Sequence, residues 1–427
     1  MEEFESTVRL RAAMVSIARD RDEVEECNRS LDELERLLDT AGGEAVIRML
    51  QIKATYDPRT CIGGGKVKEL RELCENQDVK LVVFDFELSP SQIRNLENDL
   101  GGIDVLDRTM LILDIFAKHA TTGEGKLQVE LAQLRYTSPR LTGHGLEYSR
   151  LGGTIGTRGP GETQLETDRR HLKRRVDALE AQLREMEANR NTMRAARDRS
   201  GIPQVAIVGY TNAGKSTLLN YLTDAGVLSR DQLFATLDPT TRRLEIDDRQ
   251  TVLLTDTVGF IRKLPHHLIQ AFHSTLEEAA RADVLLVLSD ATDPEGDAHL
   301  AVTEKLLSEL GAGDKPVLYV LNKCDRLDSF PSFDEKHPDT VYISAKTGEG
   351  IPHLFDMLVR ILQEGKQRVT LHIPYAEQGK MNLAYHYGTV EDVAYGEDGI
   401  IMTAVLDARG RGALREYVSA PSDDDEE

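Results

Sequence analysis

One octapeptide constrains the fold of this chain more than any other feature. Residues 209–216 read GYTNAGKS, which matches the phosphate-binding pattern GxxxxGK[ST]. The apolar run at 204–208 precedes it, and a helical pattern begins at Ser216. Phosphate binding needs this order, because glycines let backbone N–H groups converge on the phosphates and the helix N-terminus adds positive potential. The sequence therefore predicts an α/β fold: a P-loop domain whose parallel or mixed sheet carries helices on both faces.

A second motif follows at the distance that phosphate and metal binding require. Residues 251–255 form a strand pattern, and residues 256–259 read DTVG. We expect Lys215 to reach the β- and γ-phosphates, Ser216 and Asp256 to hold Mg²⁺, and the N–H of Gly259 to meet the γ-phosphate. The predicted phosphate-side residues are Gly209, Tyr210, Thr211, Asn212, Ala213, Gly214, Lys215, Ser216, Thr217, Asp256, Thr257, Val258 and Gly259.

A third pair of motifs predicts which base is bound. Residues 322–325 read NKCD after the strand pattern 316–321, and residues 344–346 read SAK after 341–343. The Asp325 carboxylate can accept hydrogen bonds from guanine N1–H and the exocyclic amine, whereas adenine leaves it unpaired. We expect Lys323 to lie along the base, Asn322 to tie loops together, and the Ala345 N–H to meet guanine O6. The predicted base-side residues of this GTP site are Asn322, Lys323, Asp325, Ser344, Ala345 and Lys346.

Two positions near these motifs bear on hydrolysis. The segment 234–242 lies where a first switch loop is expected, and Thr236, Thr240 and Thr241 are alternative Mg²⁺ ligands there. Phe260 occupies the position after DTVG at which many GTPases carry a water-orienting Gln. Phenylalanine cannot polarise water, so we predict slow hydrolysis that a partner stimulates. The alternative is that Phe260 is a core residue under a rigid loop.

Length and composition limit the remaining possibilities. The 427 residues have a net charge of −21, and the 4 cysteines form no CxxC pair, which fits a reducing cytoplasm. We expect no membrane span and a monomeric protein, although the sequence does not determine the oligomeric state. A salt-rich cytoplasm is one hypothesis for the acidic charge. The predicted division is 1–135 (a smaller α/β domain), 136–200 (glycine-rich loop and helical linker), 201–365 (GTPase domain), 366–415 (small α+β domain) and 416–427 (disordered acidic tail).

Within these segments several elements are predicted. Ser30 is a candidate N-cap for a helix in the first segment. A long helix spans about 162–197, and the segment 116–136 is expected to pack antiparallel to it. In the last domain, strands at 368–373 and 399–405 flank a helical pattern, and the chain past about Arg415 is expected to be disordered.

The chain resembles the HflX family of ribosome-associated GTPases over about residues 5–410. The characteristic segments are GGGKVKEL at 63–70, VELAQL at 129–134, PRLTG at 139–143 and GTRGPGETQLETDRR at 156–170. The resemblance implies that Thr236 is the Mg²⁺-binding and catalytic switch threonine, beside Lys215 and Gly259. It also implies that the first switch, Phe234, Ala235, Thr236, Leu237 and Asp238, lines the nucleotide. Family members bind the large ribosomal subunit, and some split ribosomes under stress.

A basic island supports an RNA partner independently. Residues 140–199 carry 13 Arg and Lys against 9 Asp and Glu in an otherwise acidic chain. The alternative is a solvated helix face with pairs such as Glu180–Arg184. Two other functions remain open: a GTPase coupled to RNA modification or remodelling, and a regulatory GTPase that binds protein without RNA. The candidate RNA contacts are Arg140, Arg150, Arg158, Arg169, Arg170, Lys173, Arg174 and Arg175.

Overall fold

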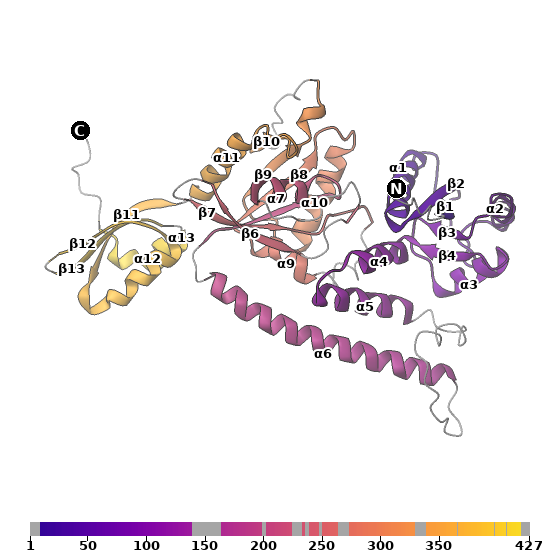
Figure 1. Ribbon diagram of the computed structural model, residues 1–427, viewed down its shortest axis with the longest axis horizontal. Helices are drawn as coiled ribbons and strands as arrows, with labels where there is room; N and C mark the ends of the chain where they lie inside the picture. The colour runs from indigo at the N-terminus through magenta and orange to yellow at the C-terminus, as the bar shows by residue number, and fades with distance from the viewer. Residues whose placement is uncertain are drawn as a thin grey trace, which may run out of the picture.

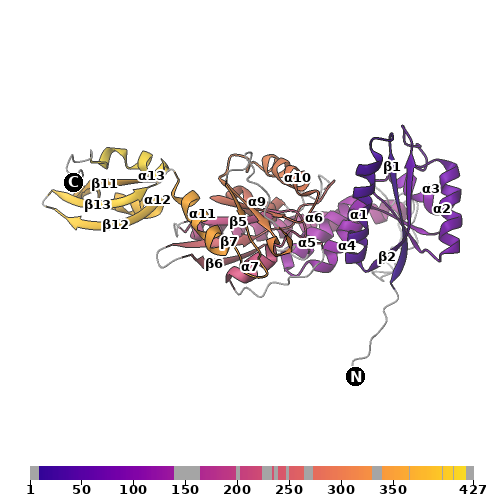
Figure 2. The same cartoon turned by 90° about the horizontal axis from the view of Figure 1, so that it is seen from above.

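The computed structural model contains three β-sheets joined by helices (Figure 1). It describes residues 9–138, 164–198, 202–223, 233–234, 239–246, 250–263, 273–328, 339–364, 366–396, 398–406 and 408–419. The sheets follow one another in space as they do in the sequence. The N-terminal sheet lies at one end, the largest sheet in the middle and the C-terminal sheet at the other end (Figure 2).

The N-terminal region is a parallel sheet with helices on both faces. Its strand order is β2-β1-β3-β4. Helices α1 and α4 cover one face, and α2 and α3 cover the other. Burial on both faces explains the continuous apolar runs of the inner strands. The elements are β1 (Leu10–Ala18), α1 (Val24–Ala41), β2 (Gly43–Ile52), α2 (Gly64–Asn76), β3 (Leu81–Phe84), α3 (Pro90–Asp99), β4 (Asp104–Asp107) and α4 (Arg108–His119).

Helix α1 begins earlier than the sequence predicts. Ser30 is not its N-cap: the helix begins at Val24, and Ser30 is buried inside it. Cys27 lies one turn before Leu31 on the same buried face. The apolar stripe therefore extends upstream, and packing against the sheet outweighs the capping preference of a serine.

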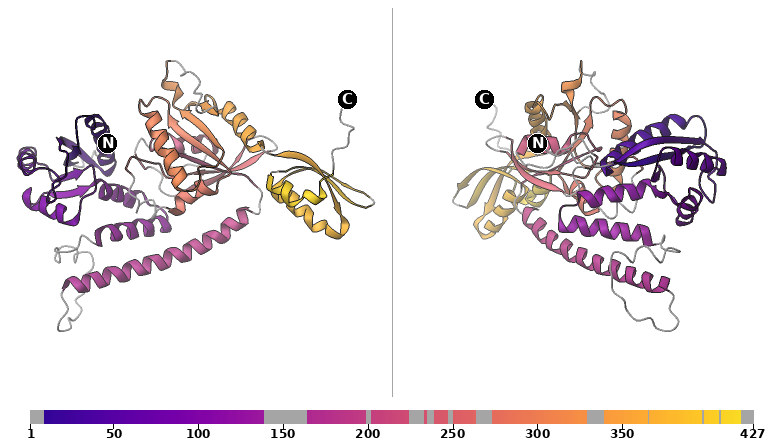
Figure 3. Two further views of the ribbon diagram at one scale, coloured as in Figure 1. Left: turned by 180° about the vertical axis from the view of Figure 1, so that it is seen from behind. Right: turned by 45° about the vertical axis from the view of Figure 1, so that its right-hand side comes forward.

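Two helices connect the N-terminal region to the central sheet. The predicted long helix is α6 (Gln164–Asp198), and α5 (Gly123–Thr137) packs against it. The segment 116–136 is divided, because α4 ends at His119 and the Thr122 side chain caps α5 by accepting the N–H of Gly125 at 2.9 Å. Ion pairs Arg190–Glu124 and Arg135–Glu180 fix an antiparallel arrangement of α5 and α6. Figure 3 shows α6 running alongside α5 and on toward the central sheet.

The central region has the predicted α/β architecture. Its strand order is β10-β9-β8-β5-β7-β6, in which only the edge strand β6 is antiparallel to its neighbour, so the sheet is mixed. Helices α7 and α11 pack on one face, and α9 and α10 pack on the other. The elements are β5 (Gln204–Gly209), α7 (Lys215–Thr223), β6 (Thr240–Glu245), β7 (Thr251–Asp256), α9 (His273–Arg281), β8 (Val284–Asp290), α10 (Gly296–Glu309), β9 (Val317–Asn322), η3 (Cys324–Arg326), β10 (Thr340–Tyr342) and α11 (Ile351–Gln363).

The C-terminal region is a small antiparallel sheet of order β11-β13-β12. Strand β12 occupies part of the segment in which the sequence predicts only a helical pattern. Residues 416–419, which the sequence assigns to the tail, are ordered: Val418 forms a bridge with Leu371. Residues 420–427 lie outside the described residues. The elements are β11 (Gln367–Pro374), η4 (Tyr375–Lys380), α12 (Met381–Tyr387), β12 (Gly388–Tyr395), β13 (Gly399–Leu406), α13 (Ala408–Ala413) and η5 (Arg415–Tyr417).

None of the helices in the described ranges is both long and apolar enough to span a bilayer.

Candidate nucleotide-binding site

The P-loop connects β5 to α7 at the carboxyl end of the sheet. Gly209 has φ +146°, and a Cβ there would lie 2.2 Å from the carbonyl oxygen of Leu288. Gly214 has φ +98°, and a Cβ there would lie 2.2 Å from Nδ2 of Asn322. Asn212, at φ +63°, is exposed at the tip of the loop. The backbone of the loop is therefore pressed against the ends of β8 and β9, which only glycine permits at these two positions.

Lys215 is buried at the start of α7. Its Nζ donates to the carbonyl oxygens of Gly209 at 3.1 Å and Tyr210 at 2.8 Å. Burial lowers the pKa of Lys215 to about 8, and the charge of Asp256 opposes that shift. A phosphate group held by the loop would favour the charged ammonium. The structure thus places the Lys215 ammonium against the P-loop backbone.

The two described candidates for Mg²⁺ binding lie side by side. Ser216 Oγ donates to Oδ2 of Asp256 at 2.7 Å, and Asp256 is fully buried at the end of β7. A hydroxyl and a carboxylate are the hard oxygen ligands that Mg²⁺ takes together with phosphate oxygens and water, so this pair fits the ion. In the described ranges no cluster of three or more His, Cys, Asp or Glu residues forms a metal site of its own. Ser216 and Asp256 are thus the described pair whose oxygen ligands fit Mg²⁺.

The base-recognition motifs converge from β9 and β10. Asn322 Nδ2 donates to the carbonyl oxygen of Ala213 at 2.8 Å, and its Oδ1 accepts the N–H of Ala345 at 2.9 Å. Asn322 therefore joins the P-loop to the SAK loop. The sequence predicts that the Ala345 N–H meets guanine O6; in the structure this donor is bonded to Asn322, because the asparagine side chain lies between the two loops.

Two charged side chains define the edge of the base site. Asp325 Oδ1 accepts the Ser344 hydroxyl at 2.7 Å, which orients a carboxylate that is exposed rather than buried. Lys323 has φ +67°, and its Nζ contacts Asp290 Oδ2 at 2.7 Å. Lys346 is exposed beside them. Adenine would leave the Asp325 carboxylate without hydrogen-bond donors, but this is costly only where water is excluded. Because Asp325 is exposed in this structure, the cost arises only when a bound base covers the carboxylate.

The first switch is only partly described. Ala235, Thr236, Leu237 and Asp238 lie outside the described residues, so the structure does not place the implied switch threonine. Thr240 pairs in register with Asp256, whereas the Thr241 hydroxyl contacts Thr255 Oγ1 at 2.9 Å. The side chain of Phe234 does not face the nucleotide as implied. It packs edge-on against Phe116 of α4, with ring centroids 4.6 Å apart, because an aromatic ring gains more from an apolar core than from a phosphate site.

The second switch begins as a backbone pairing with the P-loop. The Phe260 N–H donates to the Gly209 carbonyl at 3.1 Å, and the Thr211 N–H donates to the Phe260 carbonyl at 2.8 Å. A Cβ at Gly259 would lie 2.8 Å from Lys215 Nζ, so glycine allows this approach. Phe260 itself is only 1% exposed and belongs to the apolar core. Its side chain is a core residue, which was the alternative interpretation, and it cannot reach an attacking water.

Two further residues of the DTVG motif have buried side chains. The Thr257 hydroxyl donates to the carbonyl oxygen of Ile207 at 2.7 Å, and Thr257 and Val258 are buried. Their side chains stabilise the connection between β7 and β5. Thr217 is half-buried in the first turn of α7. The predicted nucleotide contact of Thr217 stays a prediction.

The candidate RNA contacts fall into three groups. Arg140, Arg150 and Arg158 lie outside the described residues. Arg169, Arg170, Lys173 and Arg174 are exposed on α6. Arg175 makes a bidentate pair with Glu130 of α5 at 2.7 and 2.8 Å, and Arg184 lies 3.7 Å from Glu180. Part of the island therefore holds the two helices together, and the other four side chains form an exposed cationic row on α6.

The P-loop sequence motif does not reveal the role of the Tyr210 side chain. The Tyr210 hydroxyl donates to Glu33 of α1, which is 177 residues away in the sequence, and accepts the N–H of Arg262 at 2.7 Å. A buried tyrosine hydroxyl usually has a hydrogen-bond partner, so an aromatic residue in a phosphate loop is a signal that something contacts it. The sequence does not say which residue that is.

Together the fold and these loops define a P-loop GTPase. Comparison with known proteins identifies the group within that class. The chain is 49% identical over 399 residues to the GTPase HflX of Lacrimispora saccharolytica, covering 93% of this chain and 94% of that protein. It is 44% identical over 379 residues to the GTPase HflX of Escherichia coli, covering 88% and 89%. The chain therefore belongs to the HflX family, and it binds and hydrolyses GTP.

Three family models match successive segments of the chain. Residues 28–117 match "GTP-binding GTPase N-terminal", residues 119–197 match "GTP-binding GTPase Middle Region", and residues 204–323 match "50S ribosome-binding GTPase". A solved structure, a GTP-binding protein from the archaeon Sulfolobus solfataricus in complex with GDP, is 25% identical and covers 83% of this chain and 99% of that one, with a TM-score of 0.44.

Proposed function

We propose that the GTP-bound form of this protein binds the large ribosomal subunit through the exposed cationic side chains of α6, and that GTP hydrolysis ends the complex. The GTPase segment matches a model described as a 50S ribosome-binding GTPase. The observation that carries the proposal is the exposed row Arg169, Arg170, Lys173 and Arg174 on a chain of net charge −21. Such a chain is repelled by RNA except where cations gather.

The site residues have distinct roles in this proposal. Lys215 holds the β- and γ-phosphates, and the N–H of Gly259 contacts the γ-phosphate in the GTP state. Ser216, Asp256 and the switch threonine, for which we retain Thr236, hold Mg²⁺, which when bound neutralises the charge that develops on the phosphates. Lys323 and Asp325 select guanine. These groups orient the γ-phosphate for in-line attack by water.

The rate of hydrolysis depends on how the attacking water is oriented. The Phe260 side chain is buried, so no glutamine-like group at that position orients the attacking water. We therefore propose that the protein alone turns over slowly and that the ribosomal partner either supplies such a group or moves one into place. We propose cytoplasmic action on ribosomes, with their splitting or rescue under stress as one possible physiological role.

Co-sedimentation with purified large subunits in the presence of a non-hydrolysable GTP analogue tests the proposal. Charge reversal at Arg169, Arg170 and Arg174 is expected to abolish pelleting while GDP affinity stays unchanged. A matched triple reversal of exposed cations in the N-terminal region, at Arg21, Lys68 and Arg71, is expected to pellet as wild type does. Binding by the α6 variant that equals wild type would contradict the proposed contact. GTP turnover with and without subunits measures the stimulation.

The salt dependence of binding gives a second measurement. Removing one cation that neutralises an RNA phosphate should lower the slope of log affinity against log salt concentration by about 0.7–0.9. The α6 variant is therefore expected to show a shallower slope. An unchanged slope with weaker binding would indicate a loss of shape complementarity instead of charge.

A further inference from the structure

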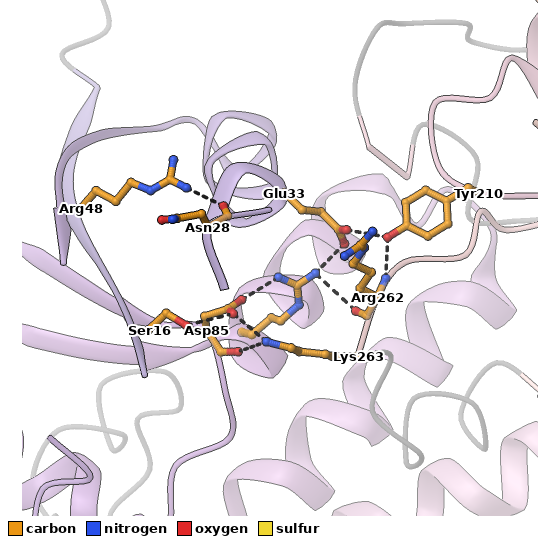
Figure 4. A network of polar contacts seen from close by, with 9 residues as sticks. Ser16, Asn28, Glu33, Arg48, Asp85, Tyr210, Arg262 and Lys263 are labelled. Carbon is orange, nitrogen blue, oxygen red and sulfur yellow. Dashed lines mark hydrogen bonds and ion pairs between the residues drawn. The ribbon is translucent and has the colours of Figure 1, made fainter. Parts of the chain in front are cut away.

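The four side chains that follow the DTVG motif are all engaged in other contacts. Phe260 and Ile261 are buried in the apolar core. The Arg262 guanidinium pairs with a carboxylate of the loop before α10 at 2.8 Å. Lys263 Nζ pairs with a carboxylate that follows β3 at 2.7 Å (Figure 4). None of these four side chains is placed to orient a water molecule beside a γ-phosphate.

One hydroxyl at the phosphate end differs from its neighbours. Ser216 Oγ donates to Asp256, and Thr257 Oγ1 donates to the carbonyl oxygen of Ile207. Thr211 of the P-loop is only 7% exposed, and its buried Oγ1 has no hydrogen-bond partner among the residues that the structure describes. An unpaired buried hydroxyl is costly and is rarely retained without a bound water or ligand to satisfy it.

Thr211 lies where the P-loop, the P-loop lysine and the second switch meet. Its N–H donates to the carbonyl oxygen of Phe260 at 2.8 Å. A Cβ added to Gly259 would lie 2.8 Å from Thr211 Cγ2 and 2.8 Å from Lys215 Nζ. The Thr211 side chain is therefore a direct neighbour of the two groups that the proposed function places on the γ-phosphate, the Lys215 ammonium and the Gly259 N–H.

The position of the Thr211 side chain is restricted by its surroundings. The hydroxyl of the preceding residue, Tyr210, donates to Glu33 and accepts the N–H of Arg262 (Figure 4). The N–H of Thr211 is itself bonded, as described above. Threonine is also β-branched, which limits rotation about χ1. The hydroxyl is thus held in place before substrate binds, which is the condition under which a polar group contributes most to a reaction.

We propose that Thr211 is a catalytic residue whose Oγ1 accepts a hydrogen bond from the water that attacks GTP. The inference rests on the proposed placement of the γ-phosphate beside Gly259. The water oxygen bonds to the γ-phosphorus while the bond from that phosphorus to the β-phosphate oxygen breaks, and GDP leaves with the electron pair. One proton of the water passes to a γ-phosphate oxygen, and Thr211 neither gains nor loses a proton.

The chemistry of a hydroxyl fits slow hydrolysis by the isolated protein. The oxygen has two lone pairs, so it can accept a hydrogen bond from water and align the water for attack. It carries no charge, so it does not neutralise the charge that develops on the phosphates. Thr211 therefore supports the basal reaction and leaves acceleration to a partner.

Thr211→Val in the full-length protein tests the proposal, because valine keeps the branching of threonine and lacks the hydroxyl. We expect the single-turnover rate at saturating enzyme to fall about tenfold or more, and the affinities for GDP and for a non-hydrolysable GTP analogue to stay within about threefold of wild type. A wild-type rate overturns the proposal. Weaker analogue binding with a wild-type rate for the bound nucleotide also overturns it, since the hydroxyl would then bind the phosphate and not the water.

Two controls separate the lost hydroxyl from a change in packing. Thr211→Ser retains the hydroxyl and is expected to hydrolyse GTP faster than Thr211→Val, and equal rates would overturn the proposal. Thr303 of α10 is 1% exposed, and its hydroxyl donates to the carbonyl oxygen of His299 at 2.9 Å. Thr303→Val is expected to keep the wild-type rate. A loss equal to that of Thr211→Val would show that any buried hydroxyl affects turnover and would contradict the assignment.

Chemical unfolding of the nucleotide-free protein gives an independent measurement. Removing an unpaired buried hydroxyl should not destabilise the fold, so the unfolding midpoint of Thr211→Val is expected to equal or exceed that of wild type. A clearly lower midpoint would mean that the hydroxyl has a structural partner, and the proposal would fail.

The proposed ribosome contact is decided by a different measurement. Thr211→Val loaded with the GTP analogue is expected to pellet with large subunits as wild type does, because pelleting requires no chemical step. Wild-type pelleting together with wild-type turnover would overturn the assignment of Thr211 alone. Slow turnover of Thr211→Val would support that assignment even if neither protein pelleted, and only the ribosome contact would then be contradicted.

Discussion

Nδ2 of Asn322 donates a hydrogen bond to the carbonyl oxygen of Ala213 at 2.8 Å, and through it the base-recognition loop holds the P-loop. The same side chain accepts the Ala345 N–H. One amide therefore sets the distance between the phosphate end and the base end of the nucleotide site. Two buried backbone groups depend on it, and each costs about 1–3 kcal/mol if left without a partner.

We predict that Asn322→Ala lowers GDP affinity at least tenfold. Without the asparagine side chain, the P-loop and the SAK loop are no longer joined. The phosphate contacts and the base contacts are then no longer held at the spacing that one nucleotide requires. Titration with a fluorescent GDP analogue measures the loss. Asn322→Asp retains an acceptor for Ala345 but not the donor to Ala213, and an intermediate affinity is expected. Wild-type affinity in Asn322→Ala would show that the loops are held by other contacts.

The glycines of the P-loop differ from those of the earlier GGGK segment. A Cβ at Gly214 would lie 2.2 Å from Asn322, whereas a Cβ at Gly65 meets nothing within 4 Å. We predict that Gly214→Ala abolishes nucleotide binding. Gly65→Ala, in the first turn of α2, should retain binding and gain up to about 1 kcal/mol from helix propensity. GDP titration and chemical unfolding of both variants check this. Loss of binding in Gly65→Ala would assign that segment a role in the site.

Base selectivity should follow the single carboxylate at Asp325. Asp325→Asn replaces a carboxylate, which only accepts hydrogen bonds, with an amide that also donates. The amide no longer matches the two donors of guanine. It matches xanthine instead, which has a carbonyl oxygen in place of the exocyclic amine. We predict weaker GTP binding and a gain in affinity for xanthosine triphosphate. Competition between the two nucleotides measures the exchange. A wild-type protein that does not discriminate against ATP would contradict the assignment of Asp325.

Phe260 should not be convertible into a catalytic glutamine. Its ring is buried in the core formed with α9 and α10, and its backbone is paired with the P-loop. We predict that Phe260→Gln destabilises the fold by about 1–3 kcal/mol, because a polar amide enters an apolar site, and does not accelerate hydrolysis. Phe260→Leu serves as the apolar control with wild-type turnover. Faster hydrolysis in Phe260→Gln would show that the side chain can turn toward the nucleotide.

Much of the nucleotide site could be predicted because its motifs are local. Gly209, Lys215 and Ser216 belong to one strand–loop–helix unit, and Asn322 and Asp325 to another, so spacing alone specifies their chemistry. The mixed α/β fold follows from the buried strand runs that carry these loops. The sequence predicts that Asn322 ties loops together, but not that Ala345 is its partner, since that depends on how two loops meet.

The contacts between distant segments lie beyond such reasoning. Phe234 looks like a switch residue in the sequence, yet its ring packs against Phe116 of another sheet's helix. Tyr210 is one of the predicted phosphate-side residues, yet its hydroxyl bonds to Glu33. Similarly, Ser30 suggests a helix start, but the apolar stripe on α1 overrides it. In each case tertiary packing decides between local options that the residue types leave open.

His299 stacks on Tyr210, with ring centroids 3.7 Å apart. Protonation of His299 makes the free energy of unfolding depend on pH. Burial lowers its pKa below 6.5, while the nearby carboxylates oppose that shift and Arg262 adds to it. The folded state thus prefers neutral His299. The unfolded chain takes up a proton first as pH falls through 6.5, so this group removes stability below that pH and has no effect well above it. The carboxylates facing it are Asp293, Glu33 and Glu295.

We therefore predict that the free energy of unfolding of the wild type falls more steeply between pH 6.5 and 5 than that of His299→Gln, by at most about 1.4 kcal/mol per pH unit. The other titrating groups are common to both proteins and cancel in the difference. Chemical unfolding at matched ionic strength over pH 5 to 8 measures the two curves. Curves that stay parallel below pH 6.5 would mean that His299 titrates as it does in the unfolded chain, and the stacked, buried environment would then not govern its charge.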